Sequence, residues 1–228
     1  MRFSAVAFDL DGTLYPDYSL NLRLAPFILK EHHLLMALGK ARKLLRNSDI
    51  KTAGSSGDFY ERQARIMGEI LGLPMEKARE LTEHLIYRGW EPLFKKINLF
   101  PHVRETLESF QKKGIKLGLL SDFPPEIKLE NLKIRDFWHA ALSSEETGYL
   151  KPDPAPFLEL AKRMDTPPEQ ILYVGNSVPY DVTGAHKVGM KAALILPKWK
   201  KRFLPGVFAS QADFSFYDYR QLCDYVVN

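Results

Sequence analysis

Residues 5–14 read Ala-Val-Ala-Phe-Asp-Leu-Asp-Gly-Thr-Leu, and they combine a strand-like apolar run with two acidic side chains at its end. Four consecutive apolar residues are typical of a short strand buried in a parallel sheet. Asp9 and Asp11 follow, and Gly12 allows a sharp turn. Residues two apart on a strand project to the same side, so both carboxylates can share a small space at its carboxyl end. Open parallel sheets bind their ligands at this edge.

Two carboxylates held that close repel each other unless a cation lies between them or one of them is protonated. Hard divalent cations, above all Mg²⁺, are the usual solution, and a substrate phosphate often completes the ligand shell. An ordinary Asp-Gly turn explains Asp11 and Gly12, but it does not require Asp9 on the buried strand. Residues 9–13, Asp-Leu-Asp-Gly-Thr, resemble the first signature of the haloacid dehalogenase-like superfamily, which consists mainly of Mg²⁺-dependent phosphatases.

The composition is that of an ordinary globular chain. With 228 residues, 45% hydrophobic and 26% charged, the chain can bury a substantial core in one large or two small domains. Cys223 is the single cysteine, so no internal disulfide can form, and we expect a cytoplasmic location. Because the apolar runs are short, we expect neither a secretory leader nor a membrane partner. The net charge of +4 is spread along the chain, so no nucleic-acid partner is expected.

The apolar pattern divides the chain into two kinds of sequence. Between residues 15 and 98, apolar residues recur at three- and four-residue spacing, as in Tyr60, Ala64, Met67 and Leu71, which predicts helices and no strand. Further along, strands and helices alternate, which is typical of a parallel sheet covered on both faces. We predict strands at 115–120, 139–142, 171–174, 192–196 and 212–216, and helices at 103–113, 127–132, 156–164, 180–188 and 219–227.

The expected fold is therefore α/β, with a Rossmann-like core made of residues 1–14 and 99–228 and helices on both faces of its parallel sheet. Residues 15–98 are expected to form an inserted all-helical domain, which resembles the cap of subfamily I members of the superfamily. A few polar residues just past the first motif could line a pocket by their position alone; these are Asp17, Tyr18, Asn21 and Arg23.

Two later stretches fall at strand ends on the same edge of the predicted sheet. Residues 119–122, Leu-Leu-Ser-Asp, resemble the second motif, in which the Ser121 hydroxyl and the Asp122 backbone N–H can donate to a phosphoryl oxygen. The alternative is an ordinary Ser-Asp turn. Residues 148–154, Gly-Tyr-Leu-Lys-Pro-Asp-Pro, resemble the third motif, in which Lys151 would offset the charge of carboxylate and phosphate. The alternative for Lys151 is a solvated loop lysine.

The fourth motif of the superfamily usually carries two acids, and this chain departs from it. Residues 173–177, Tyr-Val-Gly-Asn-Ser, followed by Asp181, resemble the motif, but Asn176 stands at the first acidic position. An amide oxygen can still ligate Mg²⁺, although it is neutral and leaves the ion less compensated. Asp181 is expected as an outer metal ligand or as the residue that orients a metal-bound water. The alternative is an acid in the first turn of a helix.

The resemblance also implies a mechanism for a small phosphomonoester substrate. Asp9 would attack phosphorus and form an aspartyl-phosphate. Asp11, with its pKa raised by crowding beside Asp9 and the phosphate, would protonate the leaving oxygen and later deprotonate the attacking water. The phosphoryl oxygens would be held by Ser121, Asp122 and Lys151. The cofactor would be Mg²⁺, held by Asp9, the Asp11 carbonyl oxygen and Asn176, with Asp181 as the outer acid.

Three other functions stay open at this point. A phosphomutase of the same fold would use the same residues and transfer the phosphoryl group instead of releasing it. A non-catalytic binding protein of the same fold is favoured only by Asn176. A 2-haloacid dehalogenase would attack carbon with Asp9, but such enzymes lack the second acid, and Asp11 argues against this function.

Two basic stretches are expected to be solvated. Residues 198–203, Lys-Trp-Lys-Lys-Arg-Phe, mix basic and aromatic side chains, but the stretch is too short for a nucleic-acid site and is predicted as an exposed loop. A second basic group is expected on the solvent-exposed face of a helix. The alternative is that it contacts an anionic substrate. The group consists of Lys40, Arg42, Lys43 and Arg46.

Overall fold

The computed structural model describes residues 2–47, 58–197 and 211–228. Its centre is a six-stranded parallel sheet with the order β3-β2-β1-β4-β5-β6. The strands are β1 (Ala5–Phe8), β2 (Lys116–Ser121), β3 (Ala140–Ser143), β4 (Ile171–Gly175), β5 (Lys191–Ile195) and β6 (Phe214–Phe216). The parallel α/β fold expected from the sequence is confirmed.

The first strand lies in the middle of the sheet, which explains why its sequence is entirely apolar. β1 pairs with β2 on one side and with β4 on the other, and all of its residues are buried. Its last residue, Phe8, is in register with Leu119 and Val174. The residues that follow these three positions must therefore meet at one edge of the sheet, where parallel strands place their ligands.

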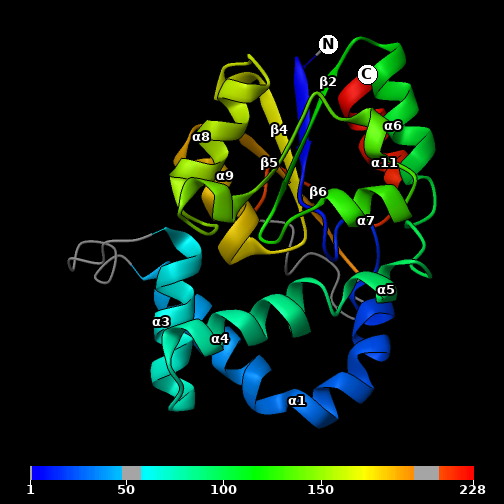
Figure 1. Cartoon of the computed structure of the whole chain (residues 1–228). Helices are drawn as coiled ribbons and strands as arrows, with labels where there is room; N and C mark the ends of the chain where they lie inside the picture. The colour runs from blue at the N-terminus through cyan, green and yellow to red at the C-terminus, as the bar shows by residue number, and fades with distance from the viewer. Residues whose placement is uncertain (1, 48–57, 198–210) are drawn as a thin grey trace.

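Alternate residues of β1 face opposite helical layers, as the two-residue period of a strand requires. Val6 and Phe8 belong to a core cluster with side chains of α6 (Val103–Lys112) and α11 (Tyr219–Val227). Ala5 and Ala7 belong to a second cluster with side chains of α8 (Pro154–Arg163) and α9 (Thr183–Lys187). Figure 1 shows α8 and α9 on one side of the sheet and α6 and α11 on the other. We call the sheet with these helices the sheet body.

The predicted strands of the sheet body are all present, and so are its predicted helices apart from one, with ends shifted by a few residues. One prediction needs correction: the helix expected at 180–188 is a π-helical turn, η5 (Val178–Val182), followed by the short α9. The remaining elements are α7 (Glu126–Asn131) and three 3₁₀ turns, η2 (Arg135–Phe137), η3 (Ser144–Thr147) and η4 (Pro168–Gln170).

Helices fill the described part of the chain between β1 and α6, and we call them the helical region. They are α1 (Asp17–Arg46), α3 (Phe59–Leu71), α4 (Met75–Thr82), the π-helical turn η1 (Glu83–Tyr87) and α5 (Glu91–Phe94). Glu31 has non-helical backbone angles inside α1, and Gly72 ends α3 in the left-handed conformation that glycine adopts without strain.

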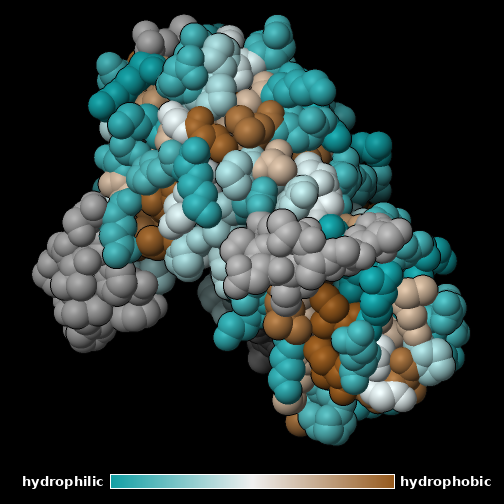
Figure 2. Space-filling view, turned by 90° about the vertical axis from the view of Figure 1, so that its left-hand side faces the viewer, coloured by the Kyte–Doolittle hydropathy of each residue, from teal (hydrophilic) through white to brown (hydrophobic). Residues whose placement is uncertain are grey.

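The helical region has a hydrophobic cluster of its own, made of Leu34, Ala37, Leu38, Ala41, Met67, Ala78 and Ile86. In Figure 1 the helical region lies below the edge of the sheet at which the strands have their carboxyl ends. Figure 2 shows hydrophobic residues gathered on the surface of this lower part. Exposed examples from α1 are Leu29 and Met36.

Two further expectations from the sequence concern the basic stretch and the membrane. The basic stretch 198–203 lies outside the described residues. In the described ranges, no helix combines the length and the apolar character needed to cross a membrane.

Candidate active site

Asp9 is buried at the end of β1, and both of its carboxylate oxygens already accept hydrogen bonds. Lys151 Nζ lies 2.6 Å from Oδ1, and Thr13 Oγ1 lies 2.8 Å from Oδ2. Burial raises the pKa of Asp9 to about 7; Lys151 opposes this shift, and the charges of Asp181 and Asp11 add to it. The structure thus fixes the orientation of this carboxyl group before any ligand arrives.

Asp11 has a different environment, dominated by a lysine that the sequence motifs do not include. Lys128 Nζ on α7 lies 2.7 Å from each carboxylate oxygen of Asp11. The Tyr15 hydroxyl also donates to Asp11, and Ser121 Oγ lies 3.4 Å from Oδ2. Burial raises the pKa of Asp11, but the charge and hydrogen bonds of Lys128, with the Tyr15 hydrogen bond, outweigh it and hold the pKa below its ordinary value. The pKa of Asp11 is thus lowered in the ligand-free chain, and the rise expected beside Asp9 and a bound phosphate stays a prediction.

Lys151 joins two acids in the interior of the sheet body. Its ammonium group lies 2.6 Å from Asp9 Oδ1 and 2.8 Å from Asp181 Oδ1, with the Tyr173 hydroxyl at 3.4 Å. Burial lowers the pKa of Lys151, but the charges of Asp181 and Asp9 outweigh burial and raise it well above the ordinary value. Lys151 is thus a fixed, buried cation beside Asp9, and the solvated-loop alternative is wrong.

Asp181 is buried, and its contacts give it a holding role. Its Oδ1 accepts from Lys151, while its Oδ2 accepts from the backbone N–H groups of Asn176 and Ser177, at 3.1 and 3.0 Å. A Cβ at Gly175 would overlap the Asp181 side chain, so glycine is needed there for this close approach. Its place as a metal ligand stays a prediction, and these contacts favour an indirect role.

Asn176 and Asp17 come together over Gly12. Gly12 has φ +78°, and a Cβ at this residue would overlap both the Asn176 amide and the Asp17 carboxylate. Asn176 Nδ2 lies 3.4 Å from Asp17 Oδ2. Burial raises the pKa of Asp17, and the charge of Asp11 adds to the shift. The space above Gly12 is therefore a cradle lined by an amide and a carboxylate.

The second motif supplies a buried hydroxyl and a docking carboxylate. Ser121 Oγ accepts from the backbone N–H of Phe123 at 3.2 Å. The Asp122 side chain accepts from Ser144 Oγ at 2.6 Å and from Arg46 Nη2 at 2.5 Å. Burial raises the pKa of Asp122, but Lys151 and nearby arginines outweigh it and lower the pKa. The side chain of Asp122 thus serves to hold loops together.

Arg42 and Arg46 attach the helical region to the sheet body, which corrects the prediction that they lie on a wet helix face. Arg42 is buried, donates to the Asp122 carbonyl oxygen and lies 2.5 Å from Glu145 Oε1. Arg46 Nε lies 2.9 Å from the Lys151 carbonyl oxygen. The pattern of α1 does not reveal this, because a basic side chain reads the same whether it meets water or a buried acid. Lys40 and Lys43 are exposed, as expected.

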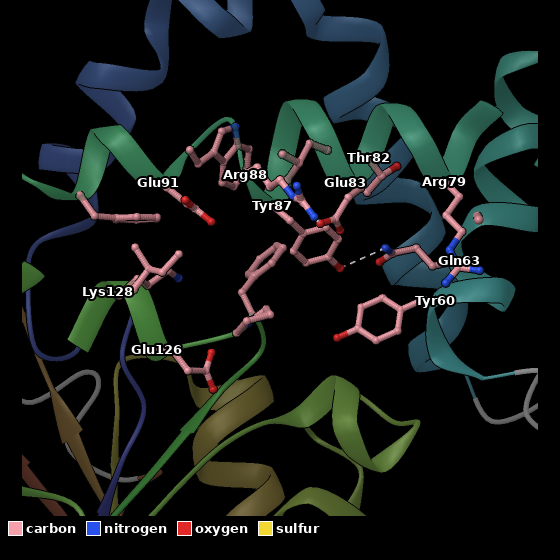
Figure 3. A pocket seen from close by; sticks show the side chains of 17 residues that line it. Tyr60, Gln63, Arg79, Thr82, Glu83, Tyr87, Arg88, Glu91, Glu126 and Lys128 are labelled. Carbon is pink, nitrogen blue, oxygen red and sulfur yellow. Dashed lines mark hydrogen bonds and ion pairs between the residues drawn. The ribbon is translucent and has the colours of Figure 1, made fainter. Parts of the chain in front are cut away.

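A cavity of about 450 Å³ lies between the helical region and the sheet body. Figure 3 shows Lys128 and Glu126 of α7 on one side of this cavity, across from Tyr87, Arg88 and Glu91. Neither Asp9 nor Asp11 belongs to the lining of this cavity, but Lys128 does, and it is paired with Asp11. Its other lining residues are Tyr60, Gln63, Ala64, Arg79, Thr82, Glu83, Ile86, Trp90, Phe94, Phe123, Pro124 and Ile127.

The residues present fit a hard divalent cation. Within the described ranges, no group of three or more His, Cys, Asp or Glu side chains is arranged to hold a metal ion. The metal ligands expected from the sequence are not three such side chains. They are one carboxylate oxygen, one backbone carbonyl oxygen and one amide oxygen. The Asn176 side chain lies against Gly12, directly after Asp11 in the chain, and all donors are oxygens of the type that Mg²⁺ prefers.

Comparison with known proteins agrees with this geometry. Residues 3–189 match the family of haloacid dehalogenase-like hydrolases. A glyceraldehyde 3-phosphate phosphatase of Methanopyrus kandleri is 31% identical over 194 residues, which cover 82% of this chain and 81% of that protein. A phosphoglycolate phosphatase of Haemophilus influenzae is 28% identical over 232 residues, 97% of each chain.

Solved structures of low identity share the fold. The crystal structure of a HAD phosphatase from Thermococcus onnurineus has a TM-score of 0.64 at 24% identity, covering 98% of this chain and 97% of that one. A 2-haloacid dehalogenase from Pseudomonas syringae has a TM-score of 0.65 at 23% identity, covering 99% and 98%. By its motifs, its fold and its relatives, this chain is an enzyme that belongs to the haloacid dehalogenase-like hydrolases.

Proposed function

We propose that this enzyme is a Mg²⁺-dependent phosphatase that hydrolyses a phosphorylated metabolite through an aspartyl-phosphate on Asp9. The observation that supports it most is the pair of acids at the end of β1, with the Lys151 ammonium group 2.6 Å from the first of them. Relatives along most of the chain are named as phosphatases. A cytoplasmic location and the division into a core (1–14 and 99–228) and a cap (15–98) belong to the same proposal.

In the first step an Asp9 oxygen attacks phosphorus, and the bond from phosphorus to the leaving oxygen breaks. Thr13 and Lys151 hold the two Asp9 oxygens at 2.8 and 2.6 Å, so the nucleophile is oriented in advance. Lys151 carries a positive charge that offsets the negative charge gathered at phosphorus. Asp181, which holds Lys151 at 2.8 Å, positions this cation.

The leaving oxygen takes a proton from Asp11, and in the second half-reaction water gives a proton back to Asp11 as it releases phosphate from Asp9. Lys128 keeps Asp11 ionised in the ligand-free chain. A bound phosphate dianion raises the pKa of a neighbouring carboxyl group and competes for the lysine. Substrate binding is therefore the event that protonates Asp11.

The remaining groups bind and enclose the phosphoryl group. Its oxygens would accept from the Ser121 hydroxyl, the Asp122 backbone N–H and Lys151. Mg²⁺, held by Asp9, the Asp11 carbonyl oxygen and Asn176, would supply neutralisation of charge during transfer. The helical region, attached through Arg42 and Arg46, would exclude water from the site.

A phosphate-release screen across phosphorylated metabolites, with Mg²⁺ and with EDTA, tests the proposal. We expect Mg²⁺-dependent release that is abolished in Asp9→Asn, and trapping of a phosphoryl group on the wild type but not on this variant. Retained activity in Asp9→Asn would remove the covalent step. An isomeric phosphate without free phosphate would identify a phosphomutase. Chloride release from a 2-chloro acid would identify a dehalogenase, and inertness towards every phosphate tested would favour a binding protein.

A further inference from the structure

We propose that the cavity between the two bodies binds the alcohol part of the substrate, and that this alcohol carries an uncharged planar ring. The inference rests on the proposed function, because it takes Asp11 as the proton donor to the leaving oxygen. Lys128 Nζ lies 2.7 Å from both Asp11 oxygens, and the same side chain lines the cavity. Because Lys128 lies between Asp11 and the cavity, a leaving group that extends from Asp11 past Lys128 would enter this cavity.

Aromatic rings in mutual contact form the walls of the cavity. Ring centroids lie 6.0 Å apart for Tyr60 and Tyr87, 6.1 Å for Tyr87 and Phe123, and 6.1 Å for Phe123 and Trp90. Phe123 belongs to the sheet body and the other rings to the helical region, so a ligand between the bodies meets rings from both sides. Aromatic surfaces of this kind favour flat ligands, which gain stacked or edge-to-face contacts.

Trp90, which lines the cavity, carries a buried donor without an acceptor. The indole Nε1 of Trp90 is shielded from solvent and has no hydrogen-bond partner among the described residues. A buried N–H left unpaired is costly, and a ligand acceptor such as a ring carbonyl or ring nitrogen would satisfy it. By contrast, the Gln63 amide is already engaged with the Tyr87 hydroxyl at 3.2 Å.

Size and charge narrow the class of alcohol further. A volume of about 450 Å³ is far more than glycolate or glyceraldehyde fills, and it lies within the range of pockets that enclose much larger ligands. The charged lining residues balance in sign, with Arg79, Arg88 and Lys128 against Glu83, Glu91 and Glu126. Lys128 is already paired with Asp11, and Arg88 with Glu83 at 2.9 Å. Among the described residues, Arg79 pairs with none of these acids and is exposed, so a second phosphate would meet one solvent-exposed cation, and a neutral ring is favoured.

The first test compares kcat/KM across monophosphates with Mg²⁺ present. The ring-bearing substrates would be nucleoside 5′-monophosphates and pyridoxal 5′-phosphate. The first carry a nucleobase and the second a pyridine ring, so the comparison shows which kind of planar ring is preferred. The comparison group would be phosphoglycolate, glyceraldehyde 3-phosphate and ribulose 1,5-bisphosphate. We expect kcat/KM at least about tenfold higher for a ring-bearing substrate. A preference for a member of the comparison group would overturn the inference and leave the phosphatase proposal standing.

Matched variants locate the effect in the cavity. Trp90→Phe keeps a ring but removes the indole N–H, and we expect it to lower kcat/KM for the preferred ring substrate roughly three- to tenfold, as loss of one hydrogen bond does. Trp138→Phe is the control, because Trp138 Nε1 is also buried and unpartnered but packs on Phe8, away from the cavity. Equal losses in both variants would contradict the inference.

A binding measurement tests the preference for a ring-bearing ligand without catalytic turnover. Calorimetric titration of Asp9→Asn with the preferred ring monophosphate and with phosphoglycolate should show at least about tenfold tighter binding of the ring compound. Phe123→Leu in the same background should reduce that ratio. Equal affinities of Asp9→Asn for the two compounds would contradict the ring inference. Failure of the phosphatase proposal would appear separately, because the wild-type enzyme would then release no phosphate from acetyl phosphate.

Discussion

The ammonium group of Lys128 lies 2.7 Å from both carboxylate oxygens of Asp11, so the second acid of the site is held as an ion pair. This pair gives the two neighbouring acids opposite character. The pKa of Asp9 is raised to about 7 by burial, while the pKa of Asp11 is lowered because Lys128 and Tyr15 outweigh burial. Lys128 therefore governs when Asp11 takes up a proton.

Replacement of Lys128 by Met is expected to raise the pKa of Asp11. Asp11 acts as an acid only when protonated, so the alkaline limb of the kcat profile should move to higher pH by about one unit or more. Steady-state kinetics from about pH 5 to about pH 9 measure this shift. Lys128→Arg keeps the charge and should restore a profile near that of the wild type. An unmoved limb in Lys128→Met would show that Lys128 does not control Asp11.

Asp9→Asn is expected to stabilise the metal-free protein more at pH 8 than at pH 5. The folded pKa of Asp9 is about 7 and the ordinary value is 3.8. Between these values the folded chain keeps a proton that the unfolded chain has lost, so stability falls as pH rises through the window. Because Asp9→Asn removes this titrating group, the gain in the free energy of unfolding should be larger at pH 8 than at pH 5 by on the order of 1–3 kcal/mol.

Denaturant unfolding in EDTA at the two pH values measures this difference. Asp136→Asn, at an exposed carboxyl of η2, is the control and should give the same small effect at both. A pH-independent gain in Asp9→Asn would mean that Asp9 is ionised throughout.

Asn176→Asp is expected to have opposite effects with and without Mg²⁺. In EDTA the new carboxylate would face Asp17, whose oxygen lies 3.4 Å from the present amide, and repulsion should lower Tm by a few degrees. With Mg²⁺ the added charge should tighten binding about tenfold, because carboxylates compensate the ion better than an amide does. Thermal unfolding across a Mg²⁺ titration measures both effects, and Asp17→Asn in the same background should relieve the loss in EDTA. Unchanged Mg²⁺ affinity would place the ion elsewhere.

Arg42→Met is expected to destabilise the protein by about 3–5 kcal/mol, because it leaves the buried Glu145 carboxylate without its cation. Lys43→Met, next to it on α1 but exposed, should change stability by less than about 0.5 kcal/mol. Urea unfolding of both variants provides the comparison. Adding Glu145→Gln to Arg42→Met should recover part of the loss, and absence of any recovery would show that the ion pair is not its cause.

Most of the sheet body could be predicted because local sequence decides it. Ala5–Phe8 is apolar at every position and can only lie in the middle of a parallel sheet, and the strand ends then bring Ser121 and Asn176 to the same edge. The close approach of Lys151 to Asp9 was expected from the resemblance of residues 148–154 to the third motif.

Long-range contacts between elements could not be predicted in this way. Lys128 lies on a short helix where an inward and an outward lysine look alike in sequence, and only the packing of α7 turns it towards Asp11. Arg42 appeared to belong to a wet helix face, because its partner Glu145 is about a hundred residues away and buried by the same contact. The lowered pKa of Asp11 in the ligand-free chain depends on Lys128, which none of the sequence motifs includes.

Arg46 ties two loops of the site to the helical region through one side chain. Its guanidinium group binds the Asp122 carboxylate and the Lys151 carbonyl oxygen, which belong to the two loops beside Asp9. If α1 moved away from the sheet body, both hydrogen bonds would break together, and the two loops would lose their shared anchor. The position of α1 is therefore coupled to the order of the two loops that flank Asp9.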